Sequence, residues 1–170
     1  ILFLIIIFFI FVNIWVLMLG FGSPIAIIAG FIFGKWIGTL LTTISLSTGS
    51  LMLYFLAKYF IYDFLKEKYE NKFNFLNNIF KNNELTIMMI YRFVGLVPFF
   101  LANLLPVIFN IRPFNYFFGT LIGILPSVFI FVSLGSGFSE ALYQYDNYPS
   151  IKELITVPGI YLPILGFILV

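Results

Sequence analysis

The sequence lacks both cysteine and histidine in its 170 residues. Without cysteine there are no disulfides, thiolate nucleophiles or thiolate metal sites, and without histidine the commonest metal ligand and general base are missing. Charged residues are also scarce, at 9% of the chain, whereas a soluble globular domain carries roughly 25%. Because so few charges cannot cover a surface in water, we expect lipid to be the main solvent of this chain.

Apolar side chains dominate instead, with 62% hydrophobic and 21% aromatic residues. Apolar segments recur along the whole chain, so a signal peptide does not explain them. The net charge of +2 is too small to indicate a nucleic acid partner. We expect a multi-pass integral membrane protein whose partners are membrane lipids and which is compatible with a homo-oligomer. Since the chain begins at Ile1 and ends at Val170 within an apolar run, we expect it to be part of a longer one.

The first 60 residues predict one spanning helix and one interrupted segment. A spanning helix needs about 20 mostly apolar residues, and residues 1–22 fit this length. Residues 24–60 are too long for one helix and too short for two spans with a loop. We predict a half-helix over 25–33, a break from Gly34 to Gly38, and then a spanning helix. The half-helix and the break form a hairpin that enters the membrane and returns, so residues 24–60 make a hairpin plus a helix.

Residues 61–84 form the one strongly polar stretch. Their apolar residues recur at three- and four-residue steps, which predicts an amphipathic helix on the membrane surface. The stretch holds four of the nine Lys and Arg residues, and Lys58 lies just before it. Because positive charge marks the inner side of a membrane, we expect this segment to be cytoplasmic, in a bacterial inner (plasma) membrane.

Residues 85–134 predict a second hairpin followed by a spanning helix. The first half is apolar but contains Pro98, Asn103 and Pro106, and each proline removes a backbone hydrogen bond. Broken helices are tolerated at membrane depth only when they are buried in protein or face a watery cavity. We expect the turn of this hairpin at Pro98 to Pro106, with Gly95 as a further hinge.

The spanning helix that follows is expected to end near Leu134, with an outer loop over 135–158 and the start of a last helix over 159–170. The predicted fold class is all-α, with two opposed re-entrant hairpins in an inverted repeat. Such repeats with broken helices are typical of transporters.

Arg92 is the strongest candidate for a functional residue. A guanidinium inside an apolar segment costs at least about 2.5–3.5 kcal/mol on insertion scales, so it needs a partner or water. One interpretation is that Arg92 caps hairpin carbonyls or reaches the cytoplasmic surface. The other is that it contacts a phosphate or lipid headgroup, which suits the planar fork of arginine.

Lys35 and Asn103 are the two other candidates for substrate binding. Lys35, at the tip of the first hairpin, either satisfies the last carbonyls of the half-helix or binds an anionic group. Asn103 either bonds backbone groups that the prolines leave free or lines the same cavity.

Several further residues have expected structural roles. Tyr54 and Lys58 share a helix face and are predicted to anchor the chain at the membrane interface. Small residues four apart predict close helix contact, and a proline follows them: these packing residues are Gly119, Gly123 and Pro126. A hydroxyl series indicates a helix interface or a polar path: Thr39, Thr42, Thr43, Ser45, Ser47, Thr48 and Ser50.

No catalytic constellation is present in the sequence, so we expect neither an enzyme nor a cofactor or metal site. Every acidic residue falls in a predicted loop or in the amphipathic segment. An intramembrane carboxylate, which proton-coupled transporters normally use, is missing.

A set of motifs occurs in order along the chain: Ala29-Gly30, Gly34-xxx-Gly38, Gly49-Ser50, Tyr54-xxx-Lys58, Arg92-Phe-Val-Gly-Leu-Val-Pro98-Phe99, Asn103, Phe117-Phe-Gly-Thr-Leu-Ile-Gly-Ile-Leu-Pro126 and Leu134-Gly135. With these motifs the sequence resembles the DedA/VTT superfamily, also called the SNARE-associated Golgi protein family, over about residues 24–138. The first hairpin of many DedA members carries an acidic residue that this chain lacks, and Pro106-Val107 replace a glycine expected after Asn103. The chain is therefore most similar to the Tvp-like branch.

This resemblance implies opposed re-entrant hairpins and a role in moving phospholipids or polyprenyl-phosphate carriers between leaflets. Our leading hypothesis is a scramblase- or flippase-like transporter in which Arg92 holds phosphate. The alternatives are a non-transporting membrane scaffold with a lipid-sensing amphipathic helix, and a transporter of small solutes.

Overall fold

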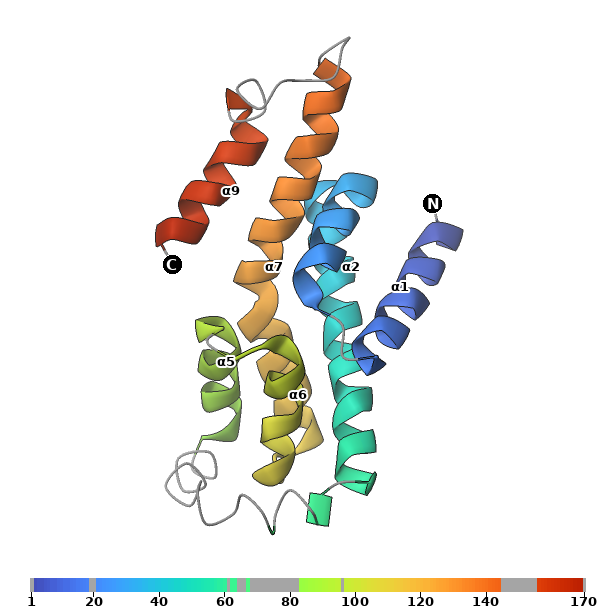
Figure 1. Cartoon of the computed structure of the whole chain (residues 1–170), viewed down its shortest axis with the longest axis vertical. Coiled ribbons are helices and arrows are strands. Elements are labelled where there is room, and N and C mark those ends of the chain that lie inside the picture. The colour runs from blue at the N-terminus through green and yellow to red at the C-terminus, as the bar shows by residue number, and fades with distance from the viewer. Residues whose placement is uncertain are drawn as a thin grey trace. The chain divides into compact units, whose positions relative to one another are not determined.

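A computed structural model describes residues 2–18, 21–60, 62–63, 67, 83–95, 97–144 and 156–169 (Figure 1). Most of the described residues are helical and none is in a strand, which confirms the all-α prediction for them. The predicted amphipathic segment, 61–84, lies almost entirely outside the described residues. The helices are α1 (Leu2–Leu17), α2 (Gly22–Phe60), α5 (Glu84–Val94), α6 (Phe99–Ile108), α7 (Pro113–Gln144) and α9 (Pro158–Leu169).

The chain divides into two compact units. Unit 1 comprises Ile1–Phe21 and Ile44–Ile124, and unit 2 comprises Gly22–Thr43 and Leu125–Val170. Two helices, α2 and α7, contribute residues to both units, and these two are long and apolar enough to cross a membrane by length and composition.

The chain reverses within α2 at Gly34. This residue has φ 73° and ψ 178°, a conformation that is essentially restricted to glycine. A Cβ atom on Gly38 would lie 2.9 Å from the carbonyl oxygen of Ala29, so the two arms of α2 lie side by side. The predicted break from Gly34 to Gly38 is therefore confined to Gly34. Gly38 is helical and serves as a contact point, because one glycine is enough to reverse the chain.

The second break lies between α5 and α6. Gly95 ends α5 in the left-handed conformation, with φ 61°, and Pro98 is the N-cap of α6. Asn103 and Pro106 lie inside α6, so the prediction that they form the turn is wrong. Pro106 is tolerated there because it stands in the last turn of a short helix, where its missing N–H removes a single backbone hydrogen bond.

The helix predicted to end near Leu134 continues to Gln144. The expected outer loop over 135–158 is therefore wrong for its first ten residues, and residues 145–155 lie outside the described part. Gly135 and Gly137 suggested a loop, but both are sites of helix packing. A Cβ atom on Gly135 would overlap the carbonyl oxygen of Ile27, and one on Gly137 would overlap the backbone of Gly159 on α9.

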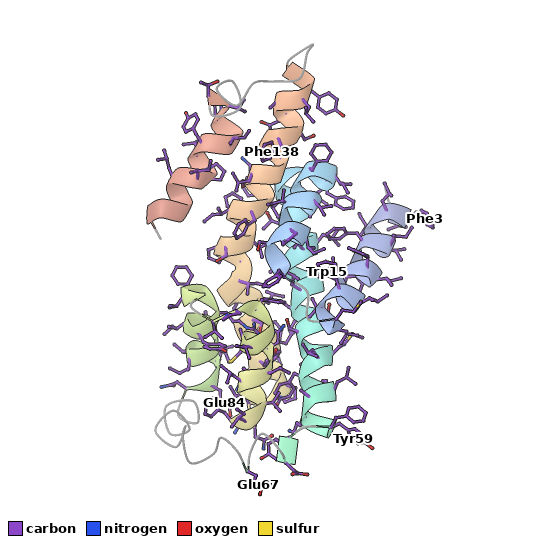
Figure 2. All side chains as sticks on the ribbon, in the orientation of Figure 1. Phe3, Trp15, Tyr59, Glu67, Glu84 and Phe138 are labelled. Carbon is purple, nitrogen blue, oxygen red and sulfur yellow. The ribbon has the colours of Figure 1, made fainter. Side chains whose placement is uncertain are left out.

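Polar and apolar side chains are distributed as expected for a protein in lipid. Large apolar side chains are exposed along α1, and Figure 2 shows Phe3, which is 73% exposed, pointing away from that helix. Many polar side chains are instead buried, although water-soluble proteins mostly keep such side chains at the surface. The buried polar residues are Asn13, Thr39, Thr42, Thr43, Ser45, Ser47, Ser50, Arg92, Asn103, Thr120, Ser133 and Ser136.

Candidate functional site around Arg92

Two glycines bring α5 close to α7 in unit 1. A Cβ atom on Gly119 would lie 2.5 Å from the Cβ of Met88, and one on Gly123 would lie 2.6 Å from the Cβ of Arg92. Only glycine allows this approach, as in other closely packed membrane helices. The packing face predicted from the Gly119-xxx-Gly123 spacing thus carries Arg92 itself, while Pro126 lies further along α7, which continues through it.

Glu84 fixes the start of α5 against the start of α7. Its Oε2 atom accepts hydrogen bonds from the Asn115 side chain at 2.6 Å and from the backbone N–H of Arg112 at 3.2 Å. The label in Figure 2 places Glu84 at the first turn of α5. Together with the glycine contacts, this pair of bonds sets the register between the two helices.

Arg92 is buried, with 5% of its surface exposed. Its Nε atom donates to the Thr120 hydroxyl at 3.2 Å, and its Nη2 atom donates to the Tyr116 hydroxyl at 2.9 Å. The guanidinium carbon also lies 5.4 Å from the centre of the Tyr116 ring and 5.8 Å from that of Phe99. Such cation–π contacts stabilise a desolvated cation but supply no counter-charge.

Asn103 joins this group through Tyr116. It is fully buried on α6, and the Tyr116 hydroxyl lies 3.3 Å from its backbone oxygen and 3.4 Å from its side-chain oxygen. The tyrosine hydroxyl can therefore accept from Arg92 and donate to Asn103. We refer to Arg92, Asn103, Tyr116 and Thr120 as the Arg92 cluster.

Two donors in the Arg92 cluster have no partner. Among the described residues, neither Nη1 of Arg92 nor Nδ2 of Asn103 meets an acceptor. Within the same part of the chain no carboxylate contacts Arg92, and Glu84 is engaged elsewhere. A buried cation and a buried amide with unpaired N–H groups are costly in isolation, so this arrangement is suited to an anion with several acceptor oxygens.

Lys35 belongs to unit 2 and is exposed. Its Nζ atom lies 5.8 Å from the centre of its neighbouring Trp36 ring, and its backbone oxygen accepts a hydrogen bond from Thr39 at 2.6 Å. The contacts within unit 1 thus bring together Arg92 and Asn103 of the three predicted binding residues. A binding role for Lys35 stays a prediction.

Tyr54 does not lie at the surface, as the predicted interface anchor would. It is fully buried in the core of unit 1, where its hydroxyl donates to the Ile111 carbonyl at 2.6 Å and its ring lies 4.8 Å from that of Tyr116. The nearby carbonyl replaces water as the partner of the hydroxyl. Lys58 remains partly exposed, with Nζ 5.9 Å from the centre of the Tyr54 ring.

Tyr116 is the functional candidate that the sequence analysis missed. A tyrosine in an aromatic-rich apolar helix carries no distinctive signal of its own. A signal was nevertheless available, because Tyr116 lies three residues before Gly119 and four before Thr120. Residues at these spacings share one helix face, and that face was already predicted to contact another helix.

Comparison with known proteins identifies the family. A family model described as the VTT domain matches residues 20–137. The chain belongs to the VTT domain family. This confirms the resemblance inferred from its motifs and establishes a membrane protein.

Two relatives of this VTT domain protein are similar to it over about three quarters of the chain. The uncharacterized protein YqeD of Bacillus subtilis (strain 168) is 27% identical, over 78% of this chain and 68% of that protein. The transmembrane protein 41 homolog of Caenorhabditis elegans is 23% identical over 74% of this chain and 54% of that protein, so the chain spans about half of this relative's length. No solved structure matches the chain.

Proposed function

We propose that this VTT domain protein moves lipids or lipid-linked phosphates between the two leaflets of a membrane. The proposal rests on one observation: in the Arg92 cluster, Nη1 of buried Arg92 and the amide nitrogen of Asn103 both lack a partner among the described residues. A phosphate group supplies both the counter-charge and the acceptor oxygens that these donors lack. Membrane lipids are the abundant source of phosphate in that setting.

The backbone supports a transporter-like arrangement. In the proposed topology, residues 24–60 and 85–144 each form a re-entrant hairpin followed by a spanning helix, and the two repeats enter from opposite faces. The reversal at Gly34 and the left-handed Gly95 before α6 are the kind of helix breaks on which such repeats depend. Headgroups would cross through the polar interior while the acyl chains stay in lipid, with residues 61–84 cytoplasmic in a bacterial inner membrane.

Lipid exchange in reconstituted vesicles tests this proposal. Short-chain fluorescent phosphatidylglycerol is placed in both leaflets, and the outer pool is followed by extraction with albumin. The wild type should make nearly all of the label extractable. Arg92→Ala should slow the exchange at least about tenfold, because a hydrogen bond to a charged group contributes about 1.5–3 kcal/mol.

Arg112→Ala is the matched control, since this arginine is exposed and only its backbone N–H contacts Glu84. It should exchange lipid at the wild-type rate. Folding of each variant is checked by its elution profile and thermal midpoint in detergent. If folded wild-type protein gives no exchange above empty vesicles, the proposal is wrong.

A non-transporting scaffold would require Arg92 to be fully paired within the protein, which its free Nη1 atom argues against. Transport of a small solute has one supporting observation. Several buried hydroxyls have no partner among the described residues, namely those of Thr42, Thr43, Ser47, Ser50 and Ser133. Flux of solute from vesicles without lipid exchange would favour this second function.

A further inference from the structure

The Arg92 cluster carries one formal charge. The residues that contact the guanidinium, namely Phe99, Tyr116 and Thr120, are all neutral, and so is Asn103. Lys58 contacts the Tyr54 ring, with Nζ 5.9 Å from its centre, and this ring lies at 37° to that of Tyr116 with the two centres 4.8 Å apart. Because Lys58 is partly exposed, water screens its charge.

The donors without a partner are NH2 groups. Nε of Arg92 and one N–H of Nη2 are engaged, which leaves the whole Nη1 group and the Asn103 amide for a ligand. These donors suit the non-bridging oxygens of a phosphate diester. A phosphate monoester in its fully ionised form brings a second negative charge, and no second cation contacts the cluster among its described residues.

We propose that the Arg92 cluster selects phosphate groups with a single negative charge, as in a diester, over doubly charged phosphate monoesters. This inference rests on the proposed function and names the substrate class of the same site. The physical reason is that a second charge taken out of water without a counter-ion carries a large desolvation penalty. The selection depends on the charge of the phosphate group, whether it is carried by a lipid or free.

Exchange of two lipids with identical acyl chains tests the selection. Phosphatidylglycerol is a diester with one charge at pH 5 and at pH 9. Phosphatidic acid is a monoester that gains its second charge above about pH 6. Vesicles are incubated at pH 5 or pH 9, and aliquots are extracted with albumin at a common pH of 7.

The two lipids should exchange at similar rates at pH 5. At pH 9 phosphatidic acid should be at least about tenfold slower than phosphatidylglycerol, because its second charge has no partner. Phosphatidylglycerol also controls for titration of the protein groups around the cluster: Glu84 and Tyr91 on α5, Tyr116 on α7, and Tyr54 and Lys58 on α2. Charged side chains are absent from α6 itself.

Each result has a distinct meaning. If phosphatidic acid exchanges between leaflets at pH 9 as fast as phosphatidylglycerol does, the selection is refuted and the proposed function stands. If both lipids slow equally at pH 9, the pH acts on the protein and the selection is again refuted. If neither lipid exchanges above empty vesicles, the proposed function itself fails.

A second measurement does not depend on transport. Thermal unfolding in detergent at pH 9 is followed with dimethyl phosphate, which has one charge, or methyl phosphate, which has two, at equal ionic strength. Binding to the folded state raises the unfolding temperature, so dimethyl phosphate should raise it and methyl phosphate should not. The rise should disappear in Arg92→Ala and persist in Arg112→Ala. An equal or larger rise with methyl phosphate, or no rise with either, would contradict the inference.

Discussion

The two compact units bring their helices together by different means. In unit 1, α5 meets α7 through both side chains and backbone: a Cβ on Gly123 would lie 2.6 Å from the Cβ of Arg92 and 2.6 Å from the carbonyl oxygen of Met89. Arg92 then bonds across the interface. In unit 2, backbone lies on backbone, because Gly135 of α7 faces the carbonyl oxygen of Ile27 on α2. The contact in unit 1 thus carries a buried cation with hydrogen bonds across it, whereas the contact at Gly135 is made by backbone and leaves almost no room for a side chain.

The largest expected effect lies in unit 2. Gly135→Leu places a side chain where the Ile27 carbonyl and the Phe31 nitrogen stand, the latter 3.0 Å from the position of a Cβ. We expect a loss of more than about 4 kcal/mol of stability, the range of severe overpacking. Thermal unfolding and elution profile in detergent measure it.

Gly34→Ala is the control for this substitution. No atom lies within 4 Å of a Cβ at Gly34, so only its φ of 73° opposes a side chain, at a cost of about 1–3 kcal/mol. If Gly135→Leu destabilises the protein less than Gly34→Ala does, the close backbone approach in unit 2 is wrong.

An intermediate effect is expected at the centre of the Arg92 cluster. Tyr116→Phe keeps the ring but removes the hydroxyl that links Arg92 to Asn103. One hydrogen bond of this kind contributes about 1–1.5 kcal/mol, so lipid exchange should slow roughly five- to tenfold. The vesicle assay with phosphatidylglycerol measures the change.

Tyr54→Phe is the matched variant outside the cluster. It loses the bond to the Ile111 carbonyl, so the free energy of unfolding should fall by about 1 kcal/mol while lipid exchange stays at the wild-type rate. Equal slowing by the two variants would show that Tyr116 acts through general packing and not through Arg92.

The smallest effect is expected at Glu84. Glu84→Gln keeps one acceptor oxygen for Asn115 and Arg112 but removes the charge near the first turn of α7. Because a partly exposed charge at a helix N-terminus contributes about 0.3–1 kcal/mol, the thermal midpoint should fall only slightly. A larger fall than in Tyr54→Phe would mean that the charge of Glu84 contributes more to stability than the buried hydrogen bond of Tyr54 does.

Glycine and proline made the breaks in the helices predictable from the sequence. Gly34 and Gly95 both adopt positive φ, and Gly119 and Gly123 contact α5 as their spacing indicates. These residues act through local backbone freedom or missing side chains, which sequence patterns record directly. The membrane assignment followed from the scarce charge and the recurring apolar segments, and the family motifs agreed with it.

Features that depend on a distant partner were not predictable. Tyr54 shares a helix face with Lys58, which indicates the membrane interface. Its burial depends on the Ile111 carbonyl, 57 residues away, and the sequence does not show that partner. The spacing of Tyr116 from Gly119 placed it on the predicted contact face, but its link to Arg92, 24 residues earlier, was visible only in the structure. The helix beyond Leu134 was missed because Gly135 and Gly137 indicate a loop unless the facing backbone is known.

The position of the partners of Arg92 also has a consequence for biosynthesis. Both side chains that accept its hydrogen bonds lie on α7, and they follow it by 24 and 28 residues. A ribosome that adds about 5–20 residues per second needs roughly 1–6 s to make that stretch. Arg92 therefore leaves the ribosome by the same interval before either of its described acceptors, and we expect the stable insertion of α5 to follow the emergence of α7.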